Sequence, residues 1–344
     1  MNMLSEIFYI VACAASPEGG IYRYAYDNGM VRQLGFTPIE NASYVTLSPD
    51  RQFMYAVCAI GGQGAAAAFK VNRDQSLSLL NIMPTEGAST CHLATSPDGK
   101  FLFCANYRNG TITEFALHDG ALLKRTKIVQ HSGRGPHLKR QDGPHAHFTS
   151  LTPDNKYLCV IDLGIDAVIC YPVTPEQGLV QDQAIVHKVE PGAGPRHLAF
   201  APDGKHAYVL TELGNTVITL AYHDGHFAHC QTISTLPKAY SGASFAAAIR
   251  VSADQRFVIA SNRGFDSLAV FKILPDATLA PQDVVLTGGK SPRDVNFLPG
   301  NLKFAAANES SDSVFFYDYD SASGKLTPDG NVITTLPCPR CIFW

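Results

Sequence analysis

Residues 192–222 have the sequence GAGPRHLAFAPDGKHAYVLTELGNTVITLAY, and this stretch is the clearest copy of a unit that recurs along the chain. A short apolar run at 197–200 leads into a Pro-Asp-Gly turn at 202–204. A second run follows at 206–210 and a third at 217–222, with polar residues between them. Apolar runs of this length, bounded by Pro, Asp, Gly and Asn, predict strands and turns rather than helices.

The same unit recurs along the whole chain, with spacings of 45 to 56 residues. Such a period, with about four short strands in each copy, is typical of a β-propeller. We therefore predict an all-β protein with seven four-stranded antiparallel blades. The repeated runs centre on Tyr24, Phe69, Phe115, Tyr171, Leu220, Phe271 and Tyr317. Six turn motifs precede strands, as in SPDRQFMYAV, SPDGKFLFCA, TPDNKYLCVI, APDGKHAYVL, SADQRFVIAS and LPGNLKFAAA.

The two ends of the chain predict how the propeller closes. The first copy lacks an opening strand, because the chain enters it directly with the apolar run 7–14. The tail PCPRCIFW (337–344) is similar to GPRHLAF (194–200) and SPRDVNF (291–297), which open other copies. We expect the C-terminal strand to join the N-terminal blade and so remove an unpaired strand edge. This predicts a single domain over residues 1–344.

Composition excludes several classes of protein. With 27 basic and 30 acidic residues, the formal charge of −3 does not suggest a partner such as nucleic acid or a membrane surface. No apolar run is long enough to cross a bilayer. The N-terminus has no Lys or Arg before its apolar run, which argues against a signal peptide and for a strand over Ile7–Ala14.

Cysteine usage indicates the compartment. The nine cysteines are an odd number without framework spacing, and most of them lie inside apolar runs. This pattern predicts reduced thiols and a cytoplasmic protein. The pair Cys338 and Cys341 fits a C-x-x-C motif, but it begins a predicted strand, and we interpret it as structural. We expect a monomer or a weak homo-oligomer.

Candidate functional residues gather at two positions of the repeat. The loop before each inner strand and the loop after each second strand open on the same end of a propeller, so their side chains should converge. Arginine forks bind carboxylate or phosphate through paired hydrogen bonds, and a nearby Glu or His can serve as a general acid or base. The first position holds His92, His145, His147, Arg196, His197, Arg250, Arg293 and Arg340. The second holds Asn106, Tyr107, Arg108, Asp162, Glu212, Asn215, Asn262, Arg263, Asn308 and Glu309.

Simpler interpretations stay open for single residues. Glu212 could merely pair with Arg196, and any one arginine could be structural. His145 and His147 alternate along a predicted strand, so both should face one side of the sheet. Two such histidines could ligate a metal, but no ligand motif accompanies them, and we expect neither a metal nor a cofactor.

One spacing exceeds the others. The 56 residues between Phe115 and Tyr171 include the stretch HSGRGPHLKRQDGPHAHF at 131–148, which is too polar for a blade strand. Insertions in repeat proteins usually form loops on one face, often the binding face. The basic side chains of this insertion either belong to a solvated loop or cover the mouth of the channel. They are Arg134, His137, Lys139 and Arg140.

These motifs resemble the lactonase family of seven-bladed propellers over essentially the whole chain. The family includes propeller-type 6-phosphogluconolactonases and 3-carboxy-cis,cis-muconate cyclases. The resemblance implies a site built from a histidine of GPHAHF, His145 or His147, together with Arg196, Glu212 and Arg263, without a required metal. The most specific segments are GPHAHF (143–148), GPRHLAF (194–200), LTELGNTV (210–217), AAAIRVSADQRFVIASNRG (246–264) and SPRDVNFLPGNLKFAAANES (291–310).

We therefore expect a small anionic substrate and a lactone hydrolase, with 6-phosphogluconolactone of the pentose phosphate route as the first candidate. A cycloisomerase that closes a carboxymuconate, or a propeller that only binds small anions, are the alternatives. The expected catalytic residues are Glu212, His145, His147 and Arg196. The expected substrate-binding residues are Arg263, His197, Arg250, Arg293, Asn106 and Glu309.

Overall fold

The computed structural model describes residues 6–344, and these form 29 strands and two short 3-10 helices. The strands make seven antiparallel sheets, so the fold is a seven-bladed β-propeller, as predicted. The chain divides into two compact units. We call residues 44–233 the middle unit, and the residues up to Ser43 with those from Ser234 the terminal unit. The single domain over 1–344 stays a prediction.

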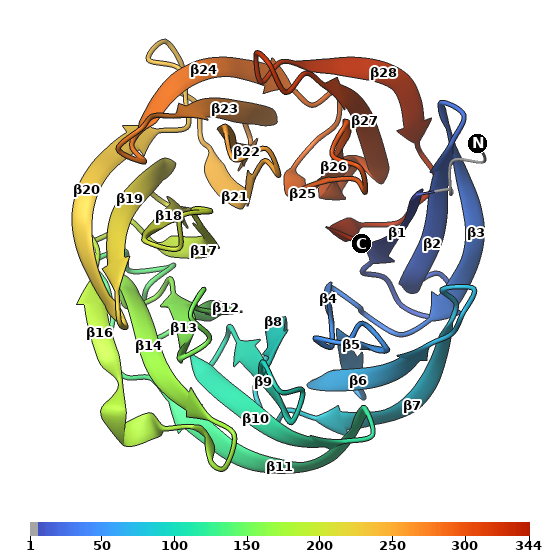
Figure 1. Cartoon of the computed structure of the whole chain (residues 1–344), viewed down its shortest axis with the longest axis vertical. Helices are drawn as coiled ribbons and strands as arrows, with labels where there is room; N and C mark the ends of the chain where they lie inside the picture. Colours follow the sequence, from blue (N-terminus) through green and yellow to red (C-terminus); the bar gives the residue numbers. More distant parts are fainter. Residues whose placement is uncertain (1–5) are drawn as a thin grey trace. The chain divides into compact units, whose positions relative to one another are not determined.

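The middle unit contains four blades. In each of these blades, the strand that comes first along the chain is innermost and the strand that comes last is outermost (Figure 1). Its strands are β4 Tyr44–Leu47, β5 Phe53–Ile60, β6 Gln63–Val71, β7 Leu77–Pro84, β8 Thr90–Thr95, β9 Phe101–Asn106, β10 Thr111–His118, β11 Ala121–Gln130, β12 Ala146–Leu151, β13 Tyr157–Asp162, β14 Ala167–Thr174, β15 Gly178–Leu179, β16 Ile185–Lys188, β17 Pro195–Phe200, β18 His206–Thr211, β19 Thr216–His223 and β20 His226–Ser234.

The terminal unit contains three blades, and one of them joins both ends of the chain. In that blade β29 pairs antiparallel with β1, which confirms the predicted closure. The C-terminus accordingly lies beside β1 in Figure 1. The strands are β1 Glu6–Ala12, β2 Gly20–Asp27, β3 Met30–Pro38, β21 Phe245–Val251, β22 Phe257–Arg263, β23 Ser267–Ile273, β24 Leu279–Leu286, β25 Pro292–Phe297, β26 Lys303–Asn308, β27 Ser313–Tyr319, β28 Leu326–Ile333 and β29 Pro339–Phe343.

The repeated turn motif explains why each second strand begins where it does. The Ser96 hydroxyl donates to the Asp98 carboxylate (2.6 Å) and accepts the backbone N–H of Phe101 (2.9 Å), the first residue of β9. A short polar side chain that bonds its own backbone in this way favours a turn. The same two bonds recur in three other blades, at Ser48, Thr152 and Ser252.

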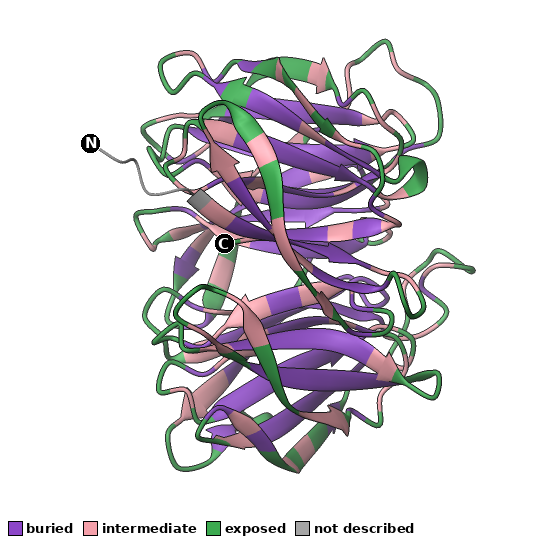
Figure 2. Ribbon diagram, turned by 90° about the vertical axis from the view of Figure 1, so that its right-hand side faces the viewer, coloured by how far each residue is buried: buried purple, intermediate pink, exposed green. Residues whose placement is uncertain are grey.

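The core lies between neighbouring blades. In the middle unit, Phe103 and Ile112 of one blade pack with Val160 and Ile169 of the next. Burying a side chain of this size stabilises a fold by roughly 1.5–3 kcal/mol. Figure 2 shows buried residues along most of the strands, and exposed residues in the connecting loops and along the outer strands. Within residues 6–344, no helix has the length and hydrophobicity to span a membrane.

One blade departs from the plain four-stranded pattern. Its outer position is divided between β15 and β16, which both pair with β14, and the 3-10 helix η1 (Gln181–Gln183) lies between them. The buried Glu114 carboxylate accepts the backbone N–H of Leu179 (2.6 Å). We infer that this side chain anchors the short strand β15 and so interrupts the outer strand.

Candidate functional site

Four blades open with the same backbone arrangement. The blade of Arg196 illustrates how this arrangement positions a side chain. Gly194 has a positive φ (59°), Pro195 pairs with Thr211, and Arg196 is the extra residue of a β-bulge. The N–H of Glu212 donates to the Gly194 carbonyl (2.7 Å). Bulges re-aim a side chain and are common beside active sites. Here the bulge brings Arg196 to Glu212.

The same arrangement recurs at matching positions. Each copy has a residue with positive φ, a bulged residue two positions later, and a residue that follows the second strand. The N–H of this last residue donates to the carbonyl of the residue with positive φ. The three other sets are Ser89, Cys91 and Tyr107; Ser291, Arg293 and Glu309; and Cys338, Arg340 and Cys13.

Two arginines hold the Glu212 carboxylate. The almost fully buried Arg196 donates from Nε to one carboxylate oxygen (3.0 Å) and from Nη1 to Nε2 of His197 (2.9 Å). Arg140 donates to the other oxygen of Glu212 and to the Tyr107 hydroxyl (3.3 Å). Burial opposes the charge of Arg140, but Glu212 outweighs it and raises the pKa of the guanidinium above its ordinary value. The simple pairing of Glu212 with Arg196 is thus part of a larger cluster.

Arg140 belongs to the insertion at 131–148, and the structure shows how that loop is held. Gln141 is fully buried, and its amide donates to the Leu163 carbonyl (2.9 Å) and to the Asp166 carboxylate (2.7 Å). These two hydrogen bonds fix Gln141, and the preceding residue, Arg140, is thereby held over Glu212. The loop therefore covers this part of the middle unit, while Arg134 and Lys139 are exposed.

His145 and His147 both lie against Tyr107. The Tyr107 ring stacks on His145 (centroids 4.6 Å apart) and meets His147 edge-on (5.6 Å). His145 Nδ1 donates to the Tyr107 carbonyl (2.8 Å), and its Nε2 lies 3.1 Å from the Asp142 carboxylate. The expected alternation along one strand is wrong, because β12 begins after His145 and a bulge interrupts its pairing at His147. The two rings still meet at Tyr107.

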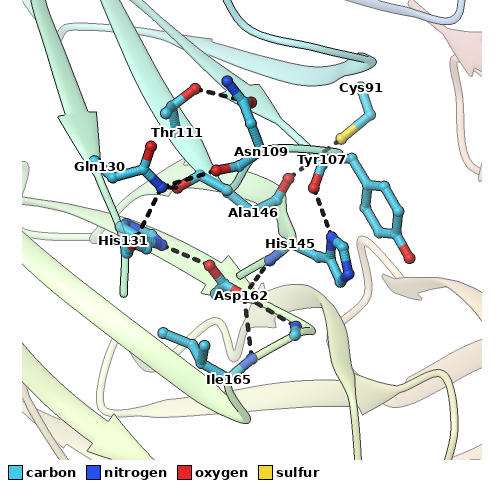
Figure 3. A network of polar contacts seen from close by, with 12 residues as sticks. Cys91, Tyr107, Asn109, Thr111, Gln130, His131, His145, Ala146, Asp162 and Ile165 are labelled. Carbon is cyan, nitrogen blue, oxygen red and sulfur yellow. Dashed lines mark hydrogen bonds and ion pairs between the residues drawn. The ribbon is translucent and has the colours of Figure 1, made fainter. Parts of the chain in front are cut away.

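A buried carboxylate fixes the backbone at His145, as Figure 3 shows. Asp162 accepts the His145 N–H (2.7 Å) and the Ile165 N–H (3.3 Å) through one oxygen. Its other oxygen accepts from Nδ1 of His131 (2.6 Å). His131 and Asp162 are both buried, so this network is a rigid support for the histidine pair.

Three imidazole rings lie close together next to Arg196. The His197 ring lies 5.4 Å from His147 and 5.9 Å from His92, measured between centroids. Phe148 packs against His197 at 5.0 Å. The middle unit therefore gathers Glu212, Arg196, His145, His147 and His197, five of the predicted site residues, around Arg140 and Tyr107.

The terminal unit holds a second charged cluster. Glu309 pairs with Arg293 (3.2 Å) and with Arg340 (2.7 Å). Burial raises the pKa of this carboxyl, but the charges of Arg293, Arg340 and Arg263 outweigh burial and hold the pKa below its usual value. Three of the expected substrate-binding residues, Arg263, Arg293 and Glu309, are therefore neighbours.

Two other predicted residues take part in contacts within the sheets. Arg250 donates to Asp294 on β25 (2.8 Å), and Asp294 also accepts the N–H of Ile342 on β29 (2.9 Å). Asn106 is fully buried, and its amide bonds Thr90, Thr111 and Thr113. These bonds tie strands together.

Sequence reasoning missed two residues and placed a third only loosely. Gln141 and Asp142 carried no motif, and their roles depend on the path of the insertion. For Arg140, the sequence indicates only that it is one of several basic residues in that insertion. The signal that could have found it was the excess length of this one repeat, which marked the loop but not which arginine turns inward.

Comparison with known proteins agrees with this architecture. The sequence model of the family described as "Lactonase, 7-bladed beta-propeller" matches residues 7–344. The chain is 33% identical to the 6-phosphogluconolactonase of Bacillus subtilis, over 99% of this chain and 98% of that protein. It is similar to the solved structure of the periplasmic gluconolactonase of Pseudomonas aeruginosa, with a TM-score of 0.89, 28% identity and 98% of each chain covered. A protein from Lactobacillus plantarum has a TM-score of 0.91 and 34% identity over 99% of both chains.

Proposed function

The chain belongs to the lactonase family of seven-bladed β-propellers, and on this premise we propose that it hydrolyses a phosphorylated sugar lactone, 6-phosphogluconolactone in the first place. The observation that carries the proposal is the buried carboxylate of Glu212 between Arg196 and Arg140, beside His145 and His147. A full-length relative named 6-phosphogluconolactonase supports the choice of substrate.

The chemistry needs three contributions from such a site. Water adds to the lactone carbonyl while a base takes its proton, negative charge builds on the carbonyl oxygen, and the ring C–O bond then breaks as its oxygen gains a proton. Guanidinium groups of Arg196 and Arg140 stabilise the oxyanion. Glu212, His145 or His147 acts as the general base and later returns a proton to the leaving oxygen.

The insertion supports a phosphorylated substrate. Arg134 and Lys139 are exposed on the loop that places Arg140 at Glu212, and the side chain of Arg140 keeps 32% of its exposure. The positive charges of this loop would attract the negatively charged phosphate of the substrate. This attraction would guide the lactone toward the buried carboxylate of Glu212.

We also propose that residues of the cluster around Glu309 bind the substrate. Arg263, Arg293 and Glu309 are neighbours in the terminal unit, and we retain them as substrate-binding candidates. Arg250 and Asn106 are weaker candidates, since their polar groups already bond neighbouring strands. Single alanine variants that raise KM at unchanged Tm would support a ligand role for each residue.

We also propose a cytoplasmic location and a monomeric or weakly self-associating protein. All nine cysteines are free thiols, which fits a reducing compartment. The similar protein of Pseudomonas aeruginosa is named as periplasmic, so the location of this protein has to be tested. Cell fractionation followed by detection with a specific antibody provides this test.

The function is tested by following acid release from freshly generated 6-phosphogluconolactone above the spontaneous rate. Parallel reactions contain the unphosphorylated gluconolactone and 3-carboxy-cis,cis-muconate. We expect the phosphorylated lactone to have the highest kcat/KM. Turnover of the muconate alone would replace hydrolysis by cycloisomerisation. Binding of the phosphorylated ligand without any turnover would indicate a small-anion-binding protein.

A further inference from the structure

The blade that joins the two ends of the chain contains a close pair of cysteines. Cys13 directly follows β1, and Cys338 directly precedes β29. The Cys13 N–H donates to the Cys338 carbonyl (3.0 Å), so the two cysteines are direct neighbours where β1 meets β29, and the Cys338 thiol also lies 3.8 Å from a carboxylate oxygen of Glu309. Both residues are partly exposed, so a small reagent can reach them from solvent.

This thiol pair occupies a position that other blades use for charged residues. Cys13 corresponds to Glu212 and Glu309, because each directly follows the second strand and donates its N–H to the residue with positive φ. In those blades the bulged arginine pairs with a carboxylate. Here the bulged residue is Arg340, the equivalent position of its own blade is Cys13, and Arg340 pairs instead with Glu309, which follows β26 (2.7 Å).

The backbone holds Cys338 in a fixed orientation. Its φ of 45° is in the left-handed region, which non-glycine residues seldom adopt. The Asp312 carboxylate accepts the Cys338 N–H (2.7 Å), and Asp312 itself lies in the left-handed region with φ 48°. Such held conformations are concentrated at functional sites.

The surroundings favour a thiolate at Cys338. A hydrogen bond from the Cys13 thiol lowers the pKa of Cys338, and the Arg340 charge adds to this effect against burial and Glu309. The same hydrogen bond and burial raise the pKa of Cys13. Thiolates react with peroxides, whereas thiols react far more slowly.

We propose that Cys13 and Cys338 are a reversible redox pair, which hydrogen peroxide oxidises to a disulfide across the junction of the two chain ends. The Cys338 thiolate attacks one peroxide oxygen, the O–O bond breaks, and hydroxide leaves, so that Cys338 becomes a sulfenic acid. The Cys13 sulfur then attacks the sulfenic sulfur, and its proton leaves with the expelled hydroxide as water. The two thiols lose two electrons, and the peroxide is reduced to two waters.

The chain provides an internal comparison. Cys159 and Cys170 face each other on β13 and β14 with their sulfur atoms 3.1 Å apart, but both are fully buried. Burial raises the pKa of Cys159. Cys13 and Cys338, which are neighbours through a backbone hydrogen bond, differ from this buried pair in being partly exposed and in having a nearby arginine, Arg340.

The test treats the full-length protein with stoichiometric hydrogen peroxide, blocks the remaining thiols by alkylation and maps peptides by mass. We expect one disulfide joining the peptides of Cys13 and Cys338, reversed by dithiothreitol. Because this bond closes a loop of almost the whole chain, the oxidised protein should unfold at a Tm roughly 5 °C higher. Cys159 and Cys170 should be recovered as thiols.

Two variants distinguish a specific redox pair from general thiol oxidation. Cys13→Ser removes the second thiol, so peroxide should leave Cys338 as a sulfenic acid that a dimedone probe labels. Cys159→Ser should form the Cys13–Cys338 disulfide as the wild type does. Equal oxidation of all exposed cysteines, or full alkylation of Cys13 and Cys338 after peroxide, would overturn the proposal. The readout is thiol chemistry and does not rest on lactone hydrolysis.

Discussion

At the scale of single residues, Arg140 connects the insertion to the buried carboxylate of Glu212. The sequence places this residue in a basic insertion that either belongs to a solvated loop or covers the channel mouth. In the structure Arg140 contacts Glu212, while Arg134 and Lys139 are exposed. The contact depends on the buried anchor Gln141, whose amide partners lie more than twenty residues away in sequence. No local pattern reports such a partner, which is why sequence could mark the loop but not its key residue.

We expect Arg140→Ala to lower kcat/KM on the order of 10- to 100-fold. The variant lacks the positive charge that pairs with Glu212 and would attract the anionic substrate. Steady-state kinetics on the phosphorylated lactone check this. Lys139→Ala, an exposed neighbour on the same loop, is the matched control and should stay within about twofold of the wild type. Equal losses in both variants would show that the loop acts only through its overall charge.

Glu309 predicts a dependence of stability on pH. Its pKa in the folded state lies below the usual 4.5, so its ion pairs stabilise the fold above that value and are lost as pH falls through the lower folded-state pKa. Thermal melts of the wild type and Glu309→Gln should therefore differ most near neutral pH and converge in acid. A difference in Tm that grows as pH falls would contradict the assignment.

At the scale of elements, strand positions followed from sequence but their irregularities did not. The Pro-Arg pairs at the start of inner strands marked where β17, β25 and β29 begin. The bulge at each arginine was not predicted, because a bulge depends on the register with the partner strand. The same cause explains the wrong alternation of His145 and His147.

Asp162 links an element to the site, since it holds the turn after β13 and the start of β12. Asp162→Ala should lower the free energy of unfolding by about 3 kcal/mol, because it leaves His131 buried without its carboxylate. Denaturant unfolding measures this. Asp182→Ala, at an exposed carboxylate of η1, should change stability by less than about 0.5 kcal/mol. A similar small change for Asp162→Ala would rule out the supporting role.

At the scale of the whole molecule, seven copies of one signal were enough to predict the fold. Because the same strand pattern recurs, an uncertain strand in one copy can be assigned from the others. The tail at 337–344, which is similar to the first strands of other blades, predicted that β29 pairs with β1. The split outer strand β15–β16 escaped prediction, because it depends on Glu114 of another blade. The architecture could thus be predicted from the repeats, whereas the contacts made between blades could not.

Removing residues 337–344 tests the closure. The truncated protein loses β29 and the buried side chains of Cys341 and Ile342, so we expect its stability to fall by roughly 3 kcal/mol or more. Calorimetry measures the change. Removal of Trp344 alone should have a small effect, because this residue lies beyond β29. An unchanged Tm after the full truncation would contradict the role of β29 in closing the blade.

The most direct test of the central claim is the kcat of Glu212→Gln on 6-phosphogluconolactone, compared with wild type and with Glu176→Gln at an exposed glutamate. We predict a loss of at least about 100-fold for Glu212→Gln in a folded protein, and no loss for the control. A folded Glu212→Gln variant that hydrolyses the lactone at the wild-type rate would contradict the placement of the chemistry between Arg196 and Arg140.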